Sequence, residues 1–209
     1  CIGYARAILY VIGFIVIDFG NLFTLAGVPV AGWAMCMLCY TLAFVLDLFD
    51  GMAARHFKQT SQLGGVLDMV IDRAATAALL TTLSGAFPAY RMYFAALVAL
   101  DVGSHWMHVA SCQLSPDGGH HKDEKTLQKR NFLLRLYYGV YPFFGYCCVG
   151  TEFFYILLIA VAYAPSDVLI KIVFTACFPA CIVKNIVNIM QLCSAVTKLA
   201  ELDVEAKRH

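Results

Sequence analysis

Long apolar runs occupy most of this chain and leave little room for a water-soluble core. A bilayer hydrocarbon core is about 30 Å thick, which a helix of about 20 apolar residues can cross. Lipid offers backbone groups no hydrogen-bond partners, so each such run is expected to be helical. Six runs qualify, with boundaries near 2–18, 29–48, 65–86, 89–113, 143–163 and 167–195. The sequence therefore predicts an all-α integral membrane protein with six transmembrane helices.

The composition supports a membrane protein and argues against several other classes. Of the 209 residues, 61% are hydrophobic and only 14% are charged, whereas soluble domains carry roughly a quarter charged residues. The formal net charge is +1 and the basic residues do not gather in one patch, so no nucleic-acid partner is expected. Most of the nine cysteines lie in apolar runs. The pair Cys36-x-x-Cys39 is interpreted as small packing residues rather than a metal or redox pair.

The organisation of the chain favours one compact membrane domain over 1–209. No internal repeat or low-complexity stretch is visible, the one long polar loop is 115–130, and a polar tail follows at 198–209. The chain opens on Cys1 with a helix already under way, which we interpret as the cut end of a longer protein. Basic residues follow the second and fourth runs and recur in the tail. The positive-inside rule therefore predicts cytosolic termini and cytosolic loops at these two places.

Four aspartates stand near the adjoining ends of the second and third runs. Asp47 and Asp50 are three residues apart, and Asp68 and Asp72 are four apart, so each pair lines one helix face. A carboxylate costs roughly 2.5–3.5 kcal/mol at the centre of a membrane helix. Four carboxylates brought together repel one another unless cations lie among them, and hard oxygen ligands suit Mg²⁺ or Mn²⁺. The spacing therefore predicts a divalent-metal site between two helices.

A second interpretation of the aspartates is purely structural. Salt bridges to Arg6, Arg55 and Arg73 could hold the helices together without any ligand. Three arginines do not balance four aspartates, and small or apolar residues join membrane helices at lower cost. The metal site is the favoured interpretation, and the structural one stays as its alternative.

The aspartates belong to a longer pattern. Asp-x2-Asp-Gly-x2-Ala-Arg-x8-Gly-x3-Asp-x3-Asp is met at all eight fixed positions between 47 and 72. This stretch resembles the signature of the CDP-alcohol phosphatidyltransferases, integral membrane enzymes of phospholipid synthesis. Four further segments resemble the inositol-using branch of that family: IGYAR (2–6), LDMVIDR (67–73), LDVGSHW (100–106) and LRLYY (134–138).

The resemblance implies the CDP-alcohol phosphatidyltransferase fold and a role for each residue of the pattern. Two divalent ions, Mg²⁺ or Mn²⁺, would be held by Asp47, Asp50, Asp68 and Asp72. The last of these, Asp72, would also act as the general base. The nucleotide and CDP-diacylglycerol side of the site would be formed by Arg6, Gly51, Ala54, Arg55 and Gly64.

An acceptor polyol needs several hydrogen-bond partners, and the fourth run offers a polar set. Its members share one helix face, and a polar stripe in lipid is expected to face the protein interior; they are Asp101, Ser104, His105 and His108. The expected inositol-binding residues are Arg73, Ser104, His105, Arg135 and Tyr138, with Lys184 as a weaker candidate. Hydrogen bonding between helices without substrate contact is the alternative for this stripe, and it is favoured for His108.

The reaction that the resemblance implies is transfer of a phosphatidyl group from CDP-diacylglycerol to myo-inositol, with release of CMP. A homodimer among membrane lipids is also implied, in the endoplasmic reticulum membrane with the site facing the cytosol. One alternative is another acceptor of the same family: glycerol phosphate, serine, choline or ethanolamine. The alternative from another class is a divalent-cation transporter, since membrane aspartates often mark ion paths. It is disfavoured because the carboxylates gather at one end and no repeated half is visible.

Overall fold

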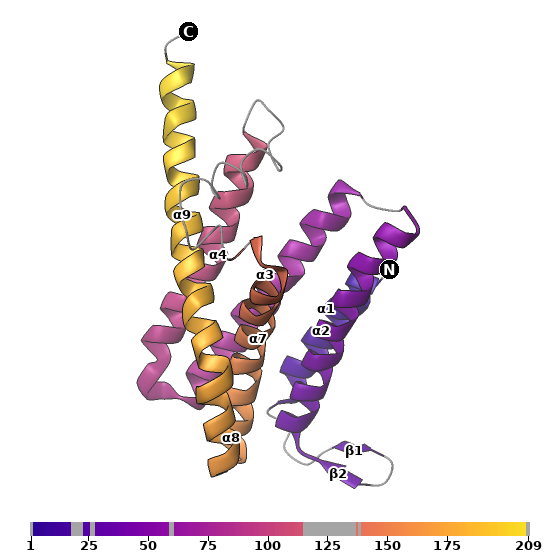
Figure 1. The fold of residues 1–209 in the computed structure, drawn as a ribbon. Helices are drawn as coiled ribbons and strands as arrows, with labels where there is room; N and C mark the ends of the chain where they lie inside the picture. The colour runs from indigo at the N-terminus through magenta and orange to yellow at the C-terminus, as the bar shows by residue number, and fades with distance from the viewer. Residues whose placement is uncertain are drawn as a thin grey trace. The chain divides into compact units, whose positions relative to one another are not determined.

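Helices form nearly all of the described chain (Figure 1). The computed structural model describes residues 2–17, 23–25, 28–58, 61–114, 137 and 139–207. Its helices are α1 (Ile2–Val16), α2 (Gly32–His56), α3 (Gln62–Ala86), the short η1 (Pro88–Tyr90), α4 (Arg91–Gln113) and α7 (Tyr141–Tyr163), followed by a continuous run of α8 (Asp167–Ile172), η2 (Val173–Cys177) and α9 (Phe178–Ala206). Each of the six predicted apolar runs corresponds to one of the long helical segments, so the predicted helical fold is confirmed.

A short hairpin between α1 and α2 departs from the predicted helices. β1 (Phe23–Leu25) and β2 (Val28–Val30) pair antiparallel, with Leu25 opposite Val28. The predicted start of the second run at 29 is therefore wrong, because Pro29 disfavours a helical conformation in the residue before it. At the true start of α2, a Cβ on Gly32 would lie 2.9 Å from the carbonyl oxygen of Ile17. Only glycine lets the chain return this close to the end of α1.

The helices have the length and composition of a multi-pass membrane protein. Among the described residues, three stretches are long and apolar enough to span a bilayer: Gly32–Ala54, Pro142–Tyr163 and Asp167–Val204. α1 is equally apolar but shorter. α3 and α4 contain 25 and 23 residues, enough to cross about 30 Å at 1.5 Å per residue. They carry more polar side chains, which include some of the site residues predicted from the sequence.

The chain divides into two compact units. Unit 1 comprises residues 1–95 and 155–170, and unit 2 comprises residues 96–154 and 171–209. Unit 1 therefore holds α1, α2, α3 and η1, whereas unit 2 holds most of α4 together with the first part of α7, η2 and α9. The expected single domain over 1–209 stays a prediction.

Close packing of α1 on α2 shapes unit 1. A Cβ on Gly13 would lie only 3.1 Å from the Cβ of Cys39, so glycine allows the two helices to approach closely. The ring centroids of Tyr10 and Tyr40 lie 4.9 Å apart in an edge-to-face arrangement next to this contact. Cys36 and Cys39 are buried free thiols. Their interpretation as packing residues therefore fits the structure.

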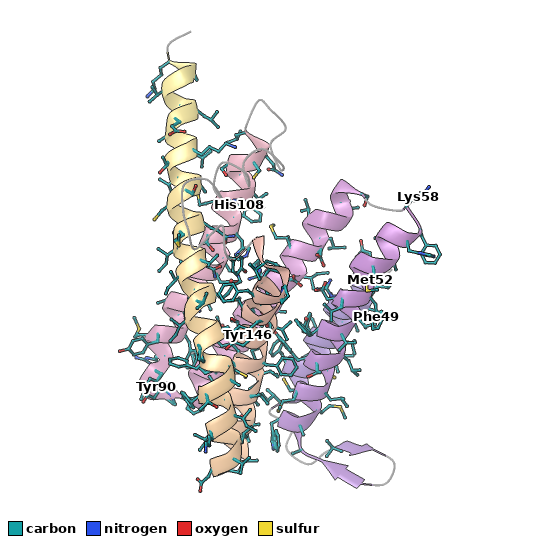
Figure 2. The ribbon with its side chains drawn as sticks, in the orientation of Figure 1. Phe49, Met52, Lys58, Tyr90, His108 and Tyr146 are labelled. Carbon is teal, nitrogen blue, oxygen red and sulfur yellow. The ribbon has the colours of Figure 1, made fainter. Side chains whose placement is uncertain are left out.

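The opposite faces of the same helices are apolar and exposed, as lipid contact requires. On α1 the exposed residues recur at helical spacing: Tyr4, Ile8, Val11 and Ile15. On α2 the stripe continues through Leu38, Leu42, Val45, Phe49 and Met52, of which the last two are labelled in Figure 2. In water such stripes would be unfavourable, whereas in a bilayer they contact hydrocarbon.

Unit 2 contains an irregular turn in its longest helical run. Val173–Cys177 forms a π-helical turn, and Pro179 explains its place because proline offers no N–H to the carbonyl of Thr175 and its ring crowds that carbonyl. The Tyr146 hydroxyl from α7 donates a hydrogen bond to the Ala176 carbonyl at 2.7 Å. A side chain from a neighbouring helix thus satisfies a backbone oxygen of the irregular turn.

Candidate functional site

A helix cap places the second half of the aspartate pattern. Ser61 is the N-cap of α3, with φ −139° and ψ 154°, and its Oγ accepts a hydrogen bond from the Gly64 N–H at 3.0 Å. A Cβ on Gly64 would lie 3.0 Å from that Oγ, so glycine leaves room for the cap. The helix that begins here carries Asp68 and Asp72 on its first turns.

Three of the four aspartates converge in unit 1. Asp47 comes from α2, and Asp68 and Asp72 come from α3. Each offers one carboxylate oxygen such that the three oxygens lie within 4.8 Å of one another. We call these three residues the acidic triad. Two helices separated along the chain by the α2–α3 connection thus meet as the sequence predicts.

An arginine from α1 lies against the acidic triad. Its Nη1 is 2.6 Å from Oδ1 of Asp47 and also contacts Oδ1 of Asp68, while its Nη2 contacts Oδ1 of Asp72. This residue, Arg6, is fully buried. The sequence predicts it on the nucleotide side of the site; in the structure its polar contacts are with the carboxylates.

The remaining residues of the pattern surround the acidic triad less closely. Asp50 lies outside the triad, and its Oδ2 is 3.7 Å from the point where a Cβ on Gly3 would stand. Gly51 and Ala54 are half-buried on α2. Arg55 follows on the same helix, but its side chain is outside the described part of the structure. The roles predicted for these residues stay predictions.

The acidic triad fits a divalent metal ion by the chemistry of its donors. Its oxygens are hard ligands of the kind that Mg²⁺ and Mn²⁺ prefer, and they come from two helices that can fix their separation. With every group ionised, Arg6 supplies one positive charge against the three negative charges of the acidic triad, and Arg73, next to Asp72 on α3, supplies a second. Further positive charge at this place would reduce the remaining repulsion.

The structural interpretation of the aspartates is therefore only partly sufficient. The ion pairs with Arg6 do join α1, α2 and α3, as that interpretation requires. Arg6 and Arg73 together do not neutralise three carboxylates, and Asp50 adds a fourth acid nearby on α2. Among the side chains that the structure describes, these two arginines leave the four acids with an excess of negative charge.

The polar stripe of α4 lies in unit 2, and several of its hydrogen bonds are made within its own helix. Ser104 is fully buried and donates a hydrogen bond to the Asp101 carbonyl at 3.1 Å. His105 Nδ1 lies 2.8 Å from the same carbonyl oxygen. His108, labelled in Figure 2, has its Nε2 3.9 Å from Cys112 Sγ one turn later.

The other predicted acceptor residues are described less completely. Arg73 is half-buried on α3, directly after Asp72. Arg135 and Tyr138 lie outside the described residues. The inositol site therefore stays a prediction from the sequence.

A buried polar contact between α4 and α9 was missed from the sequence. Asn188 is 2% exposed; its Nδ2 donates to Oδ1 of Asp101 at 3.3 Å, and its Oδ1 accepts from Lys184 Nζ at 2.7 Å. The signal was present, because Lys184, Asn188 and Gln191 recur at helical spacing in an apolar run. A polar stripe of this kind predicts a buried partner on another helix.

Comparison with known families decides the class of the protein. The sequence profile of the CDP-alcohol phosphatidyltransferases matches residues 2–199, which is most of the chain. The chain belongs to the CDP-alcohol phosphatidyltransferase family. The acidic triad is therefore part of a phosphatidyltransferase, and the resemblance seen in the aspartate pattern is confirmed.

Curated relatives of this CDP-alcohol phosphatidyltransferase share one activity in their names. The CDP-diacylglycerol–inositol 3-phosphatidyltransferase of Schizosaccharomyces pombe is 34% identical over 83% of this chain and 81% of the relative. A probable enzyme of the same name from Arabidopsis thaliana is 35% identical over 100% of this chain and 91% of its own. The Homo sapiens enzyme is 30% identical over 97% and 90%. No solved structure matches this phosphatidyltransferase significantly.

Proposed function

We propose that this protein is a phosphatidylinositol synthase, which transfers the phosphatidyl group of CDP-diacylglycerol to myo-inositol and releases CMP. The observation that carries the proposal is the convergence of the acidic triad in a chain similar over most of its length to enzymes named for this reaction. A diphosphate substrate is strongly negative and is stabilised by nearby positive charge. The acidic triad could supply that charge by binding divalent metal ions.

In the proposed site, Asp47, Asp50, Asp68 and Asp72 hold two divalent ions, Mg²⁺ or Mn²⁺. Bound ions of this kind would neutralise charge on the diphosphate oxygens. Gly51, Ala54, Arg55 and Gly64 border the nucleotide, as the aspartate pattern implies. Glycine lets a ligand approach the helix backbone closely, and the arginine fork suits bidentate contact with phosphate.

The proposed chemical step is a single in-line displacement. An inositol hydroxyl oxygen attacks the β-phosphorus, which bears the diacylglycerol, and forms the new P–O bond. The bond from that phosphorus to the oxygen of CMP breaks, and CMP leaves with the electron pair. Asp72 takes the hydroxyl proton as general base. Because no covalent nucleophile is required, catalysis rests on positioning and charge stabilisation.

The acceptor pocket is assigned from the sequence to Arg73, Ser104, His105, Arg135 and Tyr138. We further infer a multi-pass protein of the endoplasmic reticulum membrane, with the acidic triad at the cytosolic side. The positive-inside pattern supports this orientation. A homodimer is inferred from the family resemblance.

An acceptor screen tests the proposed function. The purified chain in lipid nanodiscs is given CDP-diacylglycerol, Mn²⁺ and one acceptor at a time, and CMP release is followed. We expect release with myo-inositol and none above background with glycerol 3-phosphate, serine, choline or ethanolamine. Asp72→Asn keeps the shape of the side chain but removes the base, so the rate should fall about 10²- to 10⁴-fold.

The matched control is Asp167→Asn, which alters an exposed aspartate at the start of α8. This variant should keep the rate of the unaltered protein. Faster CMP release with another acceptor would show that this acceptor, and not inositol, is the preferred substrate. Divalent-ion flux into liposomes without any CMP release would instead support a transporter and refute the enzyme.

A further inference from the structure

Arg6 combines two properties that are costly together, full burial and a formal charge. Its side chain is 0% exposed, although it lies on an apolar helix that contributes few polar groups of its own. In the part of the chain that the structure describes, its Nε has no hydrogen-bond acceptor. The polar contacts of the guanidinium described here therefore all run to the acidic triad. Because a buried charge is unfavourable without its partners, the guanidinium and the three carboxylates hold one another in a defined orientation.

The contacts with Arg6 use one side of each carboxylate. In all three ion pairs the oxygen involved is Oδ1, which leaves Oδ2 outside these pairs. The carboxylate side chains are 28%, 50% and 31% exposed for Asp47, Asp68 and Asp72, whereas Arg6 is closed off from solvent. We call the three Oδ1 atoms the inner oxygens of the acidic triad and the three Oδ2 atoms its outer oxygens.

We propose that Arg6 is the positioning residue of the metal site: it holds the inner oxygens of the acidic triad so that the outer oxygens are presented to divalent ions. The inference rests on the proposed function for the identity of those ions. Carboxylate ligands are commonly oriented by a hydrogen-bonding partner behind them, and loss of that partner weakens metal binding. A planar guanidinium suits this task because its two outer nitrogens can grip carboxylates from two helices in one fixed geometry.

The opposite arrangement, in which Arg6 fills the metal site until ions displace it, is less consistent with the contacts. A displaced guanidinium would need other acceptors, and its described polar contacts all lead to the acidic triad. Leaving the charge buried without partners would be unfavourable. The two arrangements predict opposite effects when Arg6 is removed, since a positioning residue aids metal binding and a competitor opposes it.

Metal binding itself provides the test, with no need for turnover. Mn²⁺ titrations of the full chain in nanodiscs, followed by electron paramagnetic resonance, would compare the unaltered protein with Arg6→Gln. We expect the dissociation constant for Mn²⁺ to rise about 10- to 100-fold. Arg6→Lys keeps the buried charge but not the fork, so its constant should lie between the other two.

Two controls separate positioning from a general loss of structure. Arg91→Gln removes the same charge from an exposed site at the start of α4 and should leave Mn²⁺ affinity within about twofold of the unaltered protein. Melting in EDTA gives the folded fraction of each variant. If Arg6 served only to stabilise the fold, Arg6→Gln would melt earlier while its folded fraction bound Mn²⁺ normally. That result would overturn the proposal.

Tighter Mn²⁺ binding by Arg6→Gln would also overturn it, in favour of a competing counter-ion. The outcome is distinguishable from a failure of the proposed function. Arg6-dependent Mn²⁺ binding without inositol-dependent CMP release would leave this inference standing and refute the synthase. Inositol turnover by the unaltered protein together with normal Mn²⁺ binding in Arg6→Gln would support the synthase and refute the positioning role of Arg6.

Discussion

Lys58 closes α2 in a backbone conformation that favours glycine. Its φ is +52°, the one positive value among the described residues other than glycine. The N–H of the preceding residue, Phe57, still bonds back to the Ala53 carbonyl at 2.9 Å. A left-handed residue after the last helical turn ends the helix, and Lys58 is labelled at the end of α2 in Figure 2. For a residue with a Cβ this conformation costs roughly 1–2 kcal/mol.

Lys58→Gly should therefore stabilise the protein. Relief of the left-handed strain, less the extra entropy of glycine in the unfolded chain, should give about 1 kcal/mol. In a chain of this length that corresponds to a melting temperature about 2–4 °C higher, which nanodisc thermal unfolding would measure. The same substitution at Lys171, inside a helical run, should lower the melting temperature instead. An unchanged or lower value for Lys58→Gly would contradict the strain argument.

At this scale the sequence indicates candidate residues, but it does not predict their contacts across helices. The acids of the triad were identified from spacing alone. Arg6 was expected beside the nucleotide, and the structure pairs it with Asp68 and Asp72, which lie 62 and 66 residues further along the chain. Helical periodicity reports only on neighbours three or four residues apart. A partner on another helix depends on tertiary packing, which no local pattern encodes.

At the scale of elements, the close packing of α1 on α2 keeps Arg6 within reach of the acidic triad. Gly13 stands about two turns after Arg6 on α1 and lies against Cys36 and Cys39 of α2. A residue with a side chain here would force the helices apart. The glycine thus acts on the site from a distance by letting α1 lie close enough.

Gly13→Leu should both destabilise the protein and weaken its metal site. Overpacking of this kind costs about 1–3 kcal/mol, which would lower the melting temperature by several degrees. Withdrawal of α1 should also raise the Mn²⁺ dissociation constant. Gly85→Leu is the matched control, because a Cβ at Gly85 on α3 meets nothing within 4 Å. Equal effects of the two substitutions would exclude the close α1–α2 contact as the cause.

Helix positions were predictable because a long apolar run in lipid can satisfy its backbone hydrogen bonds within one segment only as a helix. The exceptions have local causes. The β1–β2 hairpin was missed because the predicted apolar run begins at 29, inside the second strand of the hairpin. The π-helical turn was missed because apolar periodicity does not change where a single backbone hydrogen bond is lost.

At the scale of the whole molecule, the described part of each unit contains a polar centre with buried side chains that links separate helices. In unit 1 it is Arg6 with the acidic triad, and in unit 2 it is Asn188 between Asp101 and Lys184. Buried polar groups are costly unless every partner is present. Apolar helix faces can pack against many other apolar helices with little selectivity. The polar centres therefore specify which helices pair.

Asn188→Ala should destabilise the protein by about 1–3 kcal/mol, because buried polar groups of Asp101 and Lys184 lose a partner. Thermal unfolding should show a melting temperature several degrees lower. Asn185→Ala is the control: that amide donates to the Cys181 carbonyl of its own helix at 2.8 Å, so its loss should cost less. If both variants melted alike, the link between α4 and α9 would contribute nothing specific.

The position of Arg6 also bears on how the protein is assembled during synthesis. α1 carries a charge whose partners belong to α2 and α3. Alone in hydrocarbon, an arginine is unfavourable by a few kcal/mol even on the mildest scales. α1 therefore gains little from entering the bilayer before the next two helices have left the ribosome. α1, α2 and α3 should therefore integrate together, with Arg6 already paired with the carboxylates.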